Sequence, residues 1–203
     1  MNKRNQLRLL TLGAALAPLS AMAHTGHQVS GFFQGVMHPL LGADHLLVML
    51  AVGLLAAGRS RVSHQAKAGL LGKQSIVIAA AFLLAMVAGA LLAVAGVAVP
   101  FVEQGILVSV MAAGVLLALA VRFSRIAGAL MAASFALFHG LAHGAELPLA
   151  ASPLTYIAGF LITTTALLMA GTKLGQLADS YSMGLISRIA GVAVAAFGVF
   201  AAV

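Results

Sequence analysis

The sequence predicts an all-α integral membrane protein, with six transmembrane helices in one bundle after a cleaved N-terminal signal peptide. Its 203 residues are 62% hydrophobic and only 7% charged, with a mean hydropathy of +1.10. These values are far from those of an average soluble domain. Apolar stretches long enough to span a bilayer recur along the chain, and Lys and Arg fall on alternate connections between them.

The first 23 residues have the pattern of a secretory signal. A basic start precedes the apolar run LLTLGAALAPL, and the small-residue tripeptide AMA at 21–23 suits cleavage. Cleavage would make His24 the new N-terminus and leave residues 24–203 as one transmembrane domain. The alternative is an uncleaved first span, which the short apolar core disfavours, because a transmembrane helix needs about 20 residues.

The later apolar segments define six spans, which are bounded by charges and turn residues. They cover residues 36–57, 75–99, 104–121, 126–145, 152–171 and 185–203. A cleaved signal leaves the mature N-terminus outside the membrane, so the loops at 58–74, 122–125 and 172–188 should face the cytoplasm. Both mature termini should then lie in the periplasm, with the protein in a bacterial inner membrane.

The charges support this orientation. The predicted cytoplasmic loops contain every Lys and Arg of the mature chain: Arg59, Arg61, Lys67, Lys73, Arg122, Arg125, Lys173 and Arg188. Basic cytoplasmic loops are what the positive-inside rule describes. The net charge of +7 is therefore explained by topology, and it requires no nucleic-acid partner.

Small and hydroxyl-bearing residues within the spans have ordinary structural explanations. G-x-x-x-G occurs at Gly31 to Gly35 and at Gly140 to Gly144, and this pattern suits close helix packing. The hydroxyls of Thr163, Thr164 and Thr165 are expected to satisfy backbone carbonyls, although they could also line a polar path.

Ionisable residues inside the predicted spans form two groups. His38, Asp44 and His45 lie in the first span, and the stretch FHGLAHGAE adds a second group in the fourth, consisting of His139, His143 and Glu146. Such residues cost about 2.5 to 3.5 kcal/mol each on insertion scales, so they tend to face the bundle interior and mark a site. The chain has no cysteine, so any metal must be held by imidazole, carboxylate, carbonyl or water.

Both groups have helical spacing. Pro39 disfavours a helical conformation at the residue before it, so we expect His38 at the helix entrance and Pro39 as the first helical residue. His139, His143 and Glu146 share one helix stripe, on which two histidines four residues apart can chelate one ion.

The predicted depths of the two groups also match. At about 1.5 Å per residue, His45 and His139 both lie about 9 Å inside the outer ends of oppositely directed spans. His45, Asp44, His139 and His143 could then form one site in the outer third of the membrane. A lone histidine is more often a hydrogen-bond partner in the bundle, and Glu146 could be only an interfacial charge. His24 could capture metal with its free amine and imidazole, or be part of a linker.

These two motifs resemble those of the HupE/UreJ proteins, bacterial membrane permeases associated with hydrogenase and urease, which are enzymes that need nickel. The first motif is matched by His38, Pro39, Gly42, Asp44 and His45, and the second by His139, Gly140, Ala142, His143, Gly144 and Glu146. The resemblance implies facilitated uptake of nickel, or of cobalt, with His38, Asp44 and His45 essential and His139 and His143 supporting. It also implies a functional link to the maturation of those nickel enzymes.

The ligand types alone leave the metal and the chemistry open. Imidazole and carboxylate suit Ni, Co, Zn and Cu(II), and no prosthetic group is implied. The second hypothesis is an intramembrane zinc-dependent hydrolase that uses the same cluster, because zinc with an open position activates water. No H-E-x-x-H or G-x-S-x-G sequence supports it. A metal sensor or assembly partner ranks third, because it would need an ordered or sizeable soluble surface and the predicted loops are short.

Overall fold

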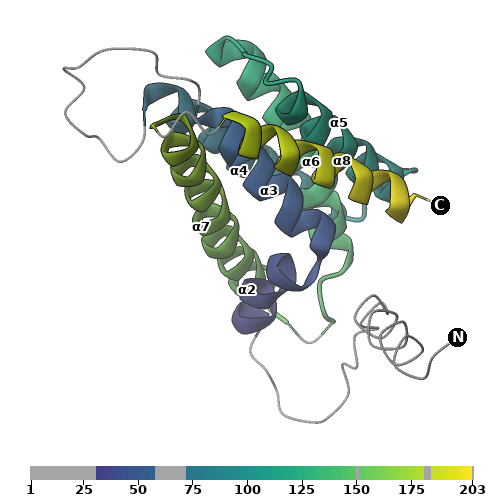
Figure 1. Ribbon diagram of the computed structural model, residues 1–203. Coiled ribbons are helices and arrows are strands. Elements are labelled where there is room, and N and C mark those ends of the chain that lie inside the picture. Colours follow the sequence, from purple (N-terminus) through teal and green to yellow (C-terminus); the bar gives the residue numbers. More distant parts are fainter. Residues whose placement is uncertain (1–30, 58–71, 150, 181–183, 203) are drawn as a thin grey trace, which may run out of the picture.

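The computed structural model describes residues 31–57, 72–149, 151–180 and 184–202, and it folds them into seven helices with no strand among them (Figure 1). The helices are α2 (Gly31–Leu41), α3 (Ala43–Ala56), α4 (Lys73–Val94), α5 (Val102–Ala118), α6 (Arg125–Ala145), α7 (Pro153–Ser180) and α8 (Gly184–Ala201). The all-helical prediction is confirmed. The predicted signal peptide, residues 1–23, and His24 lie outside the described residues.

Four helices, α4, α6, α7 and α8, are long and apolar enough to cross a membrane. The pair α2 and α3 passes the same test together but is bent by 75°, so it counts as a fifth span only if both parts cross as one. Helix α5 is apolar but shorter, with 17 residues. Each of the six predicted ranges therefore contains helix in the described chain, whereas six complete crossings and the cleaved signal remain predictions.

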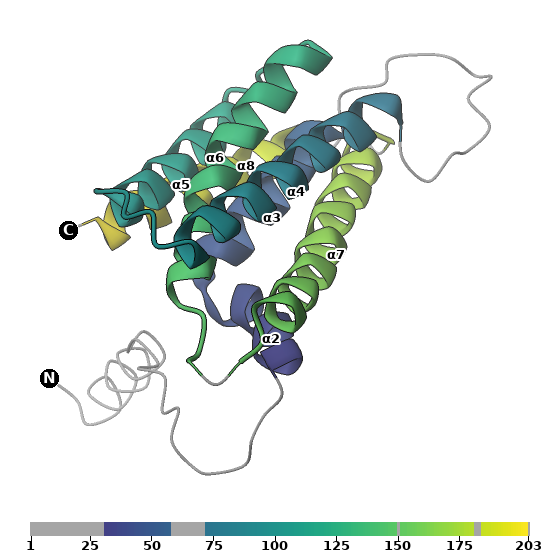
Figure 2. The same ribbon diagram turned by 180° about the vertical axis from the view of Figure 1, so that it is seen from behind.

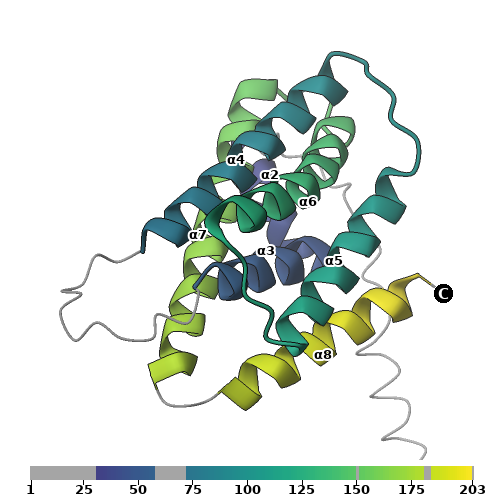
Figure 3. The ribbon, with the colours of Figure 1, turned by 90° about the horizontal axis from the view of Figure 1, so that it is seen from above.

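Helix α3 lies at the centre of the bundle, as Figures 1 and 2 show from opposite sides. It contacts α4, α5, α6, α7 and α8, and Val48, Met49 and Val52 on it are completely buried. Around it, α4 packs along α6, α5 packs along α8, and α2 packs along α7 (Figure 3). A helix that is apolar on all sides is typical of such a central position.

Glycines allow the helix backbones to approach closely. A methyl group on Gly140 of α6 would overlap the Met86 carbonyl of α4, and one on Gly144 would meet the Cα of Ala90 at 2.9 Å. The order of these contacts shows that α4 and α6 are parallel. Helices α3 and α7 are parallel too, since a methyl group on Gly171 would overlap the Leu50 carbonyl and one on Gly175 would meet the Cα of Leu54 at 3.4 Å. Close contact through small residues is the usual packing mode in bilayers.

Two helix ends differ from the prediction. Helix α4 ends at Val94 and not near residue 99, because Gly96 adopts a φ of 83° and the amides of Gly96 and Val97 bond back to Ala93 and Leu92 at 2.9 and 3.0 Å. This is a Schellman end, which favours glycine. Helix α7 continues to Ser180, so the predicted loop at 172–188 was wrong for its first part. Polar residues end the apolar stretch there without ending the helix.

The two ends of the bundle have opposite character. The described basic residues gather at one end: Lys73, Arg122, Arg125, Lys173 and Arg188. A cavity of about 370 Å³ opens among them, between the ends of α3, α5 and α7 and the starts of α4 and α8. The histidines of both predicted groups lie toward the opposite end. The described residues that flank the connections predicted to share one face of the membrane therefore lie at one end of the bundle.

The glycine contacts predict that Gly140→Ala destabilises the protein. The added methyl group has to displace the α4 backbone, so we expect a cost of about 1 to 3 kcal/mol and a lower melting temperature in detergent. Gly72→Ala is the matched control, because nothing lies within 4 Å of a methyl group there. Equal melting temperatures for the two variants would show that α4 and α6 do not pack as described.

Candidate metal centre

The first predicted span is broken at Gly42, and this break builds half of the site. Helix α2 begins at Gly31, so His38 and Pro39 lie in its last turns, and the prediction that Pro39 is the first helical residue was wrong. The missing N–H of Pro39 removes only one hydrogen bond so near the helix end. Gly42 then takes an extended conformation (φ −83°, ψ 111°) and α3 starts at Ala43. His38 and His45 consequently approach the site from two helices at an angle.

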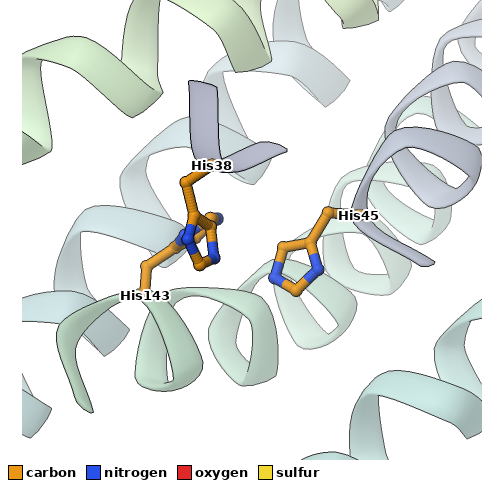
Figure 4. Close-up of side chains that lie close together, drawn as sticks. All are labelled: His38, His45 and His143. Atoms are coloured by element: carbon orange, nitrogen blue, oxygen red, sulfur yellow. The ribbon is translucent and has the colours of Figure 1, made fainter. Parts of the chain in front are cut away.

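The break brings histidines of both motifs together. The ring centroid of His143 lies 4.6 Å from that of His38 and 4.7 Å from that of His45, and His139 lies 4.6 Å from His45. One ring nitrogen from each of His38, His45 and His143 falls within 4.8 Å of the others. Figure 4 shows these three side chains converging from α2, α3 and α6. We call these three residues the histidine triad.

Asp44 orients His45. Its Oδ1 accepts the backbone N–H of His45 at 2.8 Å and the Nδ1–H of the same residue at 2.9 Å. The Nε2 lone pair of His45 is thus left free, and this buried atom has no hydrogen-bond partner among the described residues. A carboxylate behind an imidazole fixes the tautomer and raises the basicity of the ligand. A methyl group on Gly42 would meet both Asp44 Oδ1 and His45 Nδ1 at 3.1 Å, so glycine leaves room for this pair.

Glu146 has the same relation to His38. It caps the end of α6, and its Oε2 accepts from His38 Nε2 at 3.0 Å, so the carboxylate favours the proton of a neutral His38 ring on Nε2. The hydrogen bond from His38 holds the pKa of Glu146 below its usual range, although burial acts in the opposite direction. Glu146 is therefore more than an exposed interfacial charge. The two carboxylates together offset positive charge at the triad.

The histidines of α6 are the most deeply buried members of the site. His143 has no exposed surface, stacks on Phe160 of α7 at 4.6 Å and 11°, and has no partner for either ring nitrogen among the described residues. His139 is also fully buried and bonds to Ser109 of α5 at 3.0 Å. An unsatisfied buried polar atom costs about 1 to 3 kcal/mol, and imidazole nitrogens suit divalent transition metals. The arrangement therefore fits a bound metal ion.

The structure brings six of the seven predicted site residues to this place: His38, Asp44, His45, His139, His143 and Glu146. Asp44 and Glu146 lie behind histidines, whereas the sequence grouped Asp44 with the ligands. The sequence did not point to Ser109, Phe160 or Tyr156, whose ring lies 6.1 Å from that of His38. The sequence offered one indication of the two aromatic residues. Tyr156 and Phe160 are four residues apart, so they lie on one face of α7.

These features define a multi-pass helical membrane protein with a histidine cluster inside one end of its bundle. A family model described as HupE / UreJ protein matches residues 12–201. Protein HupE of Rhizobium leguminosarum bv. viciae is 36% identical over 188 residues, covering 93% of each chain. The chain belongs to the HupE/UreJ family. No solved structure matches it.

Family membership decides between two of the hypotheses from the sequence. The HupE/UreJ proteins are membrane transport or accessory proteins and not enzymes, so the hydrolase hypothesis is set aside.

The pairing of Asp44 with His45 predicts that Asp44→Asn weakens Ni²⁺ binding by about 10- to 100-fold, as loss of an outer-shell carboxylate usually does. Asparagine can still accept the hydrogen bond, so the variant removes mainly the charge. Titration calorimetry of the protein in detergent measures the change. Glu103→Gln, at an exposed acid that starts α5, is the control. A similar loss in both variants would contradict a specific role for Asp44.

Proposed function

We propose that the protein is a permease that takes up a divalent transition metal, with nickel as its main cargo and cobalt as a second one. The observation that carries this proposal is the histidine triad within the membrane-embedded bundle, with its nitrogens within 4.8 Å of one another. The resemblance to HupE/UreJ proteins favours nickel. The imidazole donors alone would equally accept Zn or Cu(II).

The outer carboxylates and the triad suggest how an ion enters. The side chains of His38 and Glu146 are 26% and 53% exposed, so a hydrated cation can reach them first. The ion then exchanges water for the imidazoles of His45 and His143, while Asp44 and Glu146 offset its charge. A membrane potential that is negative inside favours inward movement by about 2.3 kcal/mol per charge per 100 mV. In this proposal the gradient of the metal ion and the membrane potential drive facilitated uptake.

This function requires the site to face the periplasm. We place the protein in the bacterial inner membrane with its basic end in the cytoplasm, because that end holds the described Lys and Arg residues. The bent pair α2 and α3 and the short helix α5 complete six crossings in this proposal. Residues 1–23 are removed as a signal peptide, residues 24–203 form the permease domain, and His24 at the new N-terminus contributes to metal capture.

We further propose that the imported metal supplies nickel enzymes. The resemblance to HupE/UreJ proteins points to hydrogenase or urease maturation as the destination. In this role the partners of the chain are the metal ion and the lipid bilayer.

Uptake of radioactive Ni²⁺ into sealed proteoliposomes tests the proposal directly. We expect the native protein to accumulate Ni²⁺, with Co²⁺ competing, and His45→Ala to lower the rate by about tenfold or more, because the triad loses its carboxylate-backed ligand. His64→Ala, in the predicted cytoplasmic loop, is the matched control and should transport normally. Native protein that binds Ni²⁺ without accumulating it would exclude a permease.

The orientation makes a separate prediction about reporter fusions. Alkaline phosphatase is active only outside the cytoplasm, so a fusion after Val203 should be active and one inserted between Ser63 and His64 should be inactive. Enzyme activity in intact cells measures both. The reverse pattern would place the histidine triad on the cytoplasmic side, and the proposal of uptake from the periplasm would then be wrong.

A further inference from the structure

Buried polar atoms that have no hydrogen-bond partner among the described residues concentrate around the triad. They are His45 Nε2, His139 Nδ1, both ring nitrogens of His143, Tyr156 Oη and Thr164 Oγ1. Two of them, on His139 and Thr164, belong to residues outside the triad that lie deeper in the bundle. Each such atom is costly when buried without a partner, so this second pair calls for an explanation.

Ser109 determines which nitrogen of His139 is free. The Ser109 hydroxyl donates its proton to the Ile106 carbonyl at 2.7 Å, so its oxygen can only accept from His139 Nε2–H at 3.0 Å. The proton of the neutral ring is thereby held on Nε2, and the lone pair lies on Nδ1. His139 is one helical turn, about 6 Å, deeper along α6 than His143. Its ring centroid lies 4.6 Å from that of His45, which belongs to the triad.

Thr164 reaches the same depth from α7. Phe160 of α7 stacks on His143 of α6. Thr164 lies one helical turn beyond Phe160 toward the basic end, and His139 lies one turn beyond His143 in the same direction, so the two residues are at one level. Thr164 is completely buried. The neighbouring hydroxyls are occupied, because Thr163 donates to the Val36 carbonyl at 2.8 Å and Thr165 to the Leu161 carbonyl at 2.6 Å. The expectation that all three satisfy backbone carbonyls was therefore wrong for Thr164.

We propose that His45, His139 and Thr164 form a second metal position one turn inside the triad. An ion moves inward by keeping His45 Nε2 as a ligand, releasing His38 and His143, and gaining His139 Nδ1 and Thr164 Oγ1. Ser109 is a positioning residue, since it keeps His139 Nδ1 available. The cargo class is a divalent transition metal, as in the proposed function on which this inference rests. Successive sites that share a ligand permit binding without trapping the ion.

The two positions can be separated by Co²⁺ binding, which requires no transport. Thr164→Val keeps the shape of the side chain and removes only its hydroxyl, and Thr165→Val is the matched control. With the triad intact, we expect Thr164→Val to change Co²⁺ affinity by less than about twofold. In a His38→Ala background it should lower the affinity by about tenfold and shift the visible absorption of bound Co²⁺. Thr165→Val should do neither.

Ni²⁺ flux into proteoliposomes gives the second measurement. Thr164→Val and Ser109→Ala should slow uptake by about tenfold while Ni²⁺ affinity is retained, and Ser109→Thr should restore it, because the hydroxyl is kept.

The outcomes distinguish this inference from the proposed function. If the His38→Ala variant and the His38→Ala, Thr164→Val double variant bind Co²⁺ with the same affinity, the inner position is overturned. It is also overturned if the native protein and Thr164→Val transport Ni²⁺ at the same rate. If the native protein shows no flux but the Co²⁺ result is as expected, the permease function fails and the inner position stands.

Discussion

The high cost of burying polar groups away from water is the constraint that shapes this protein. Several buried hydroxyls meet it by donating to backbone carbonyls: Ser75 donates to the Ala56 carbonyl of α3 at 2.9 Å, and Thr172 donates to the Leu168 carbonyl of its own helix at 2.8 Å. A break in a helix is tolerated at membrane depth only where the protein itself covers the exposed backbone. At Gly42 the break leaves its own backbone groups satisfied, because the Gly42 amide donates to the His38 carbonyl at 3.2 Å and the Gly42 carbonyl accepts from the Leu46 amide at 2.9 Å. The histidine site is where the constraint is relaxed.

Close packing through glycines makes that site compact. Gly35 lets α2 approach the α7 backbone at Tyr156 and Phe160, and Gly140 lets α6 approach α4. Phe160 then provides the flat surface on which His143 stacks. With larger residues at these glycines the helices would separate, and imidazoles from α2, α3 and α6 could not share one ion. Packing and chemistry therefore depend on the same small residues.

The sequence was sufficient for the helical class, for the approximate positions of the helices and for the meeting of the two histidine groups. The helical class and the helix positions were predicted mainly from hydropathy and from the distribution of Lys and Arg. It was insufficient where backbone geometry decides: the 75° bend at Gly42, the early end of α4 at Gly96 and the helical continuation of α7 past Lys173. Ser109 and Thr164 could not be singled out either, because a hydroxyl in an apolar helix usually bonds to its own backbone, as Thr165 does.

The two ends of the proposed path carry opposite charges, and this difference affects how the ion moves along it. Asp44 and Glu146 lie behind the triad, whereas the cavity at the other end is lined by Lys73 and Arg122. A divalent cation is thus attracted at its entrance and repelled at its exit, so it is not retained once it leaves the imidazoles. The repulsion must be overcome during inward movement, and a potential of 100 mV contributes about 4 to 5 kcal/mol for two charges. The charges of the basic end act on exit and on return alike, so they shorten the stay of the ion at that end, whereas the metal gradient and the membrane potential set the direction of net flux.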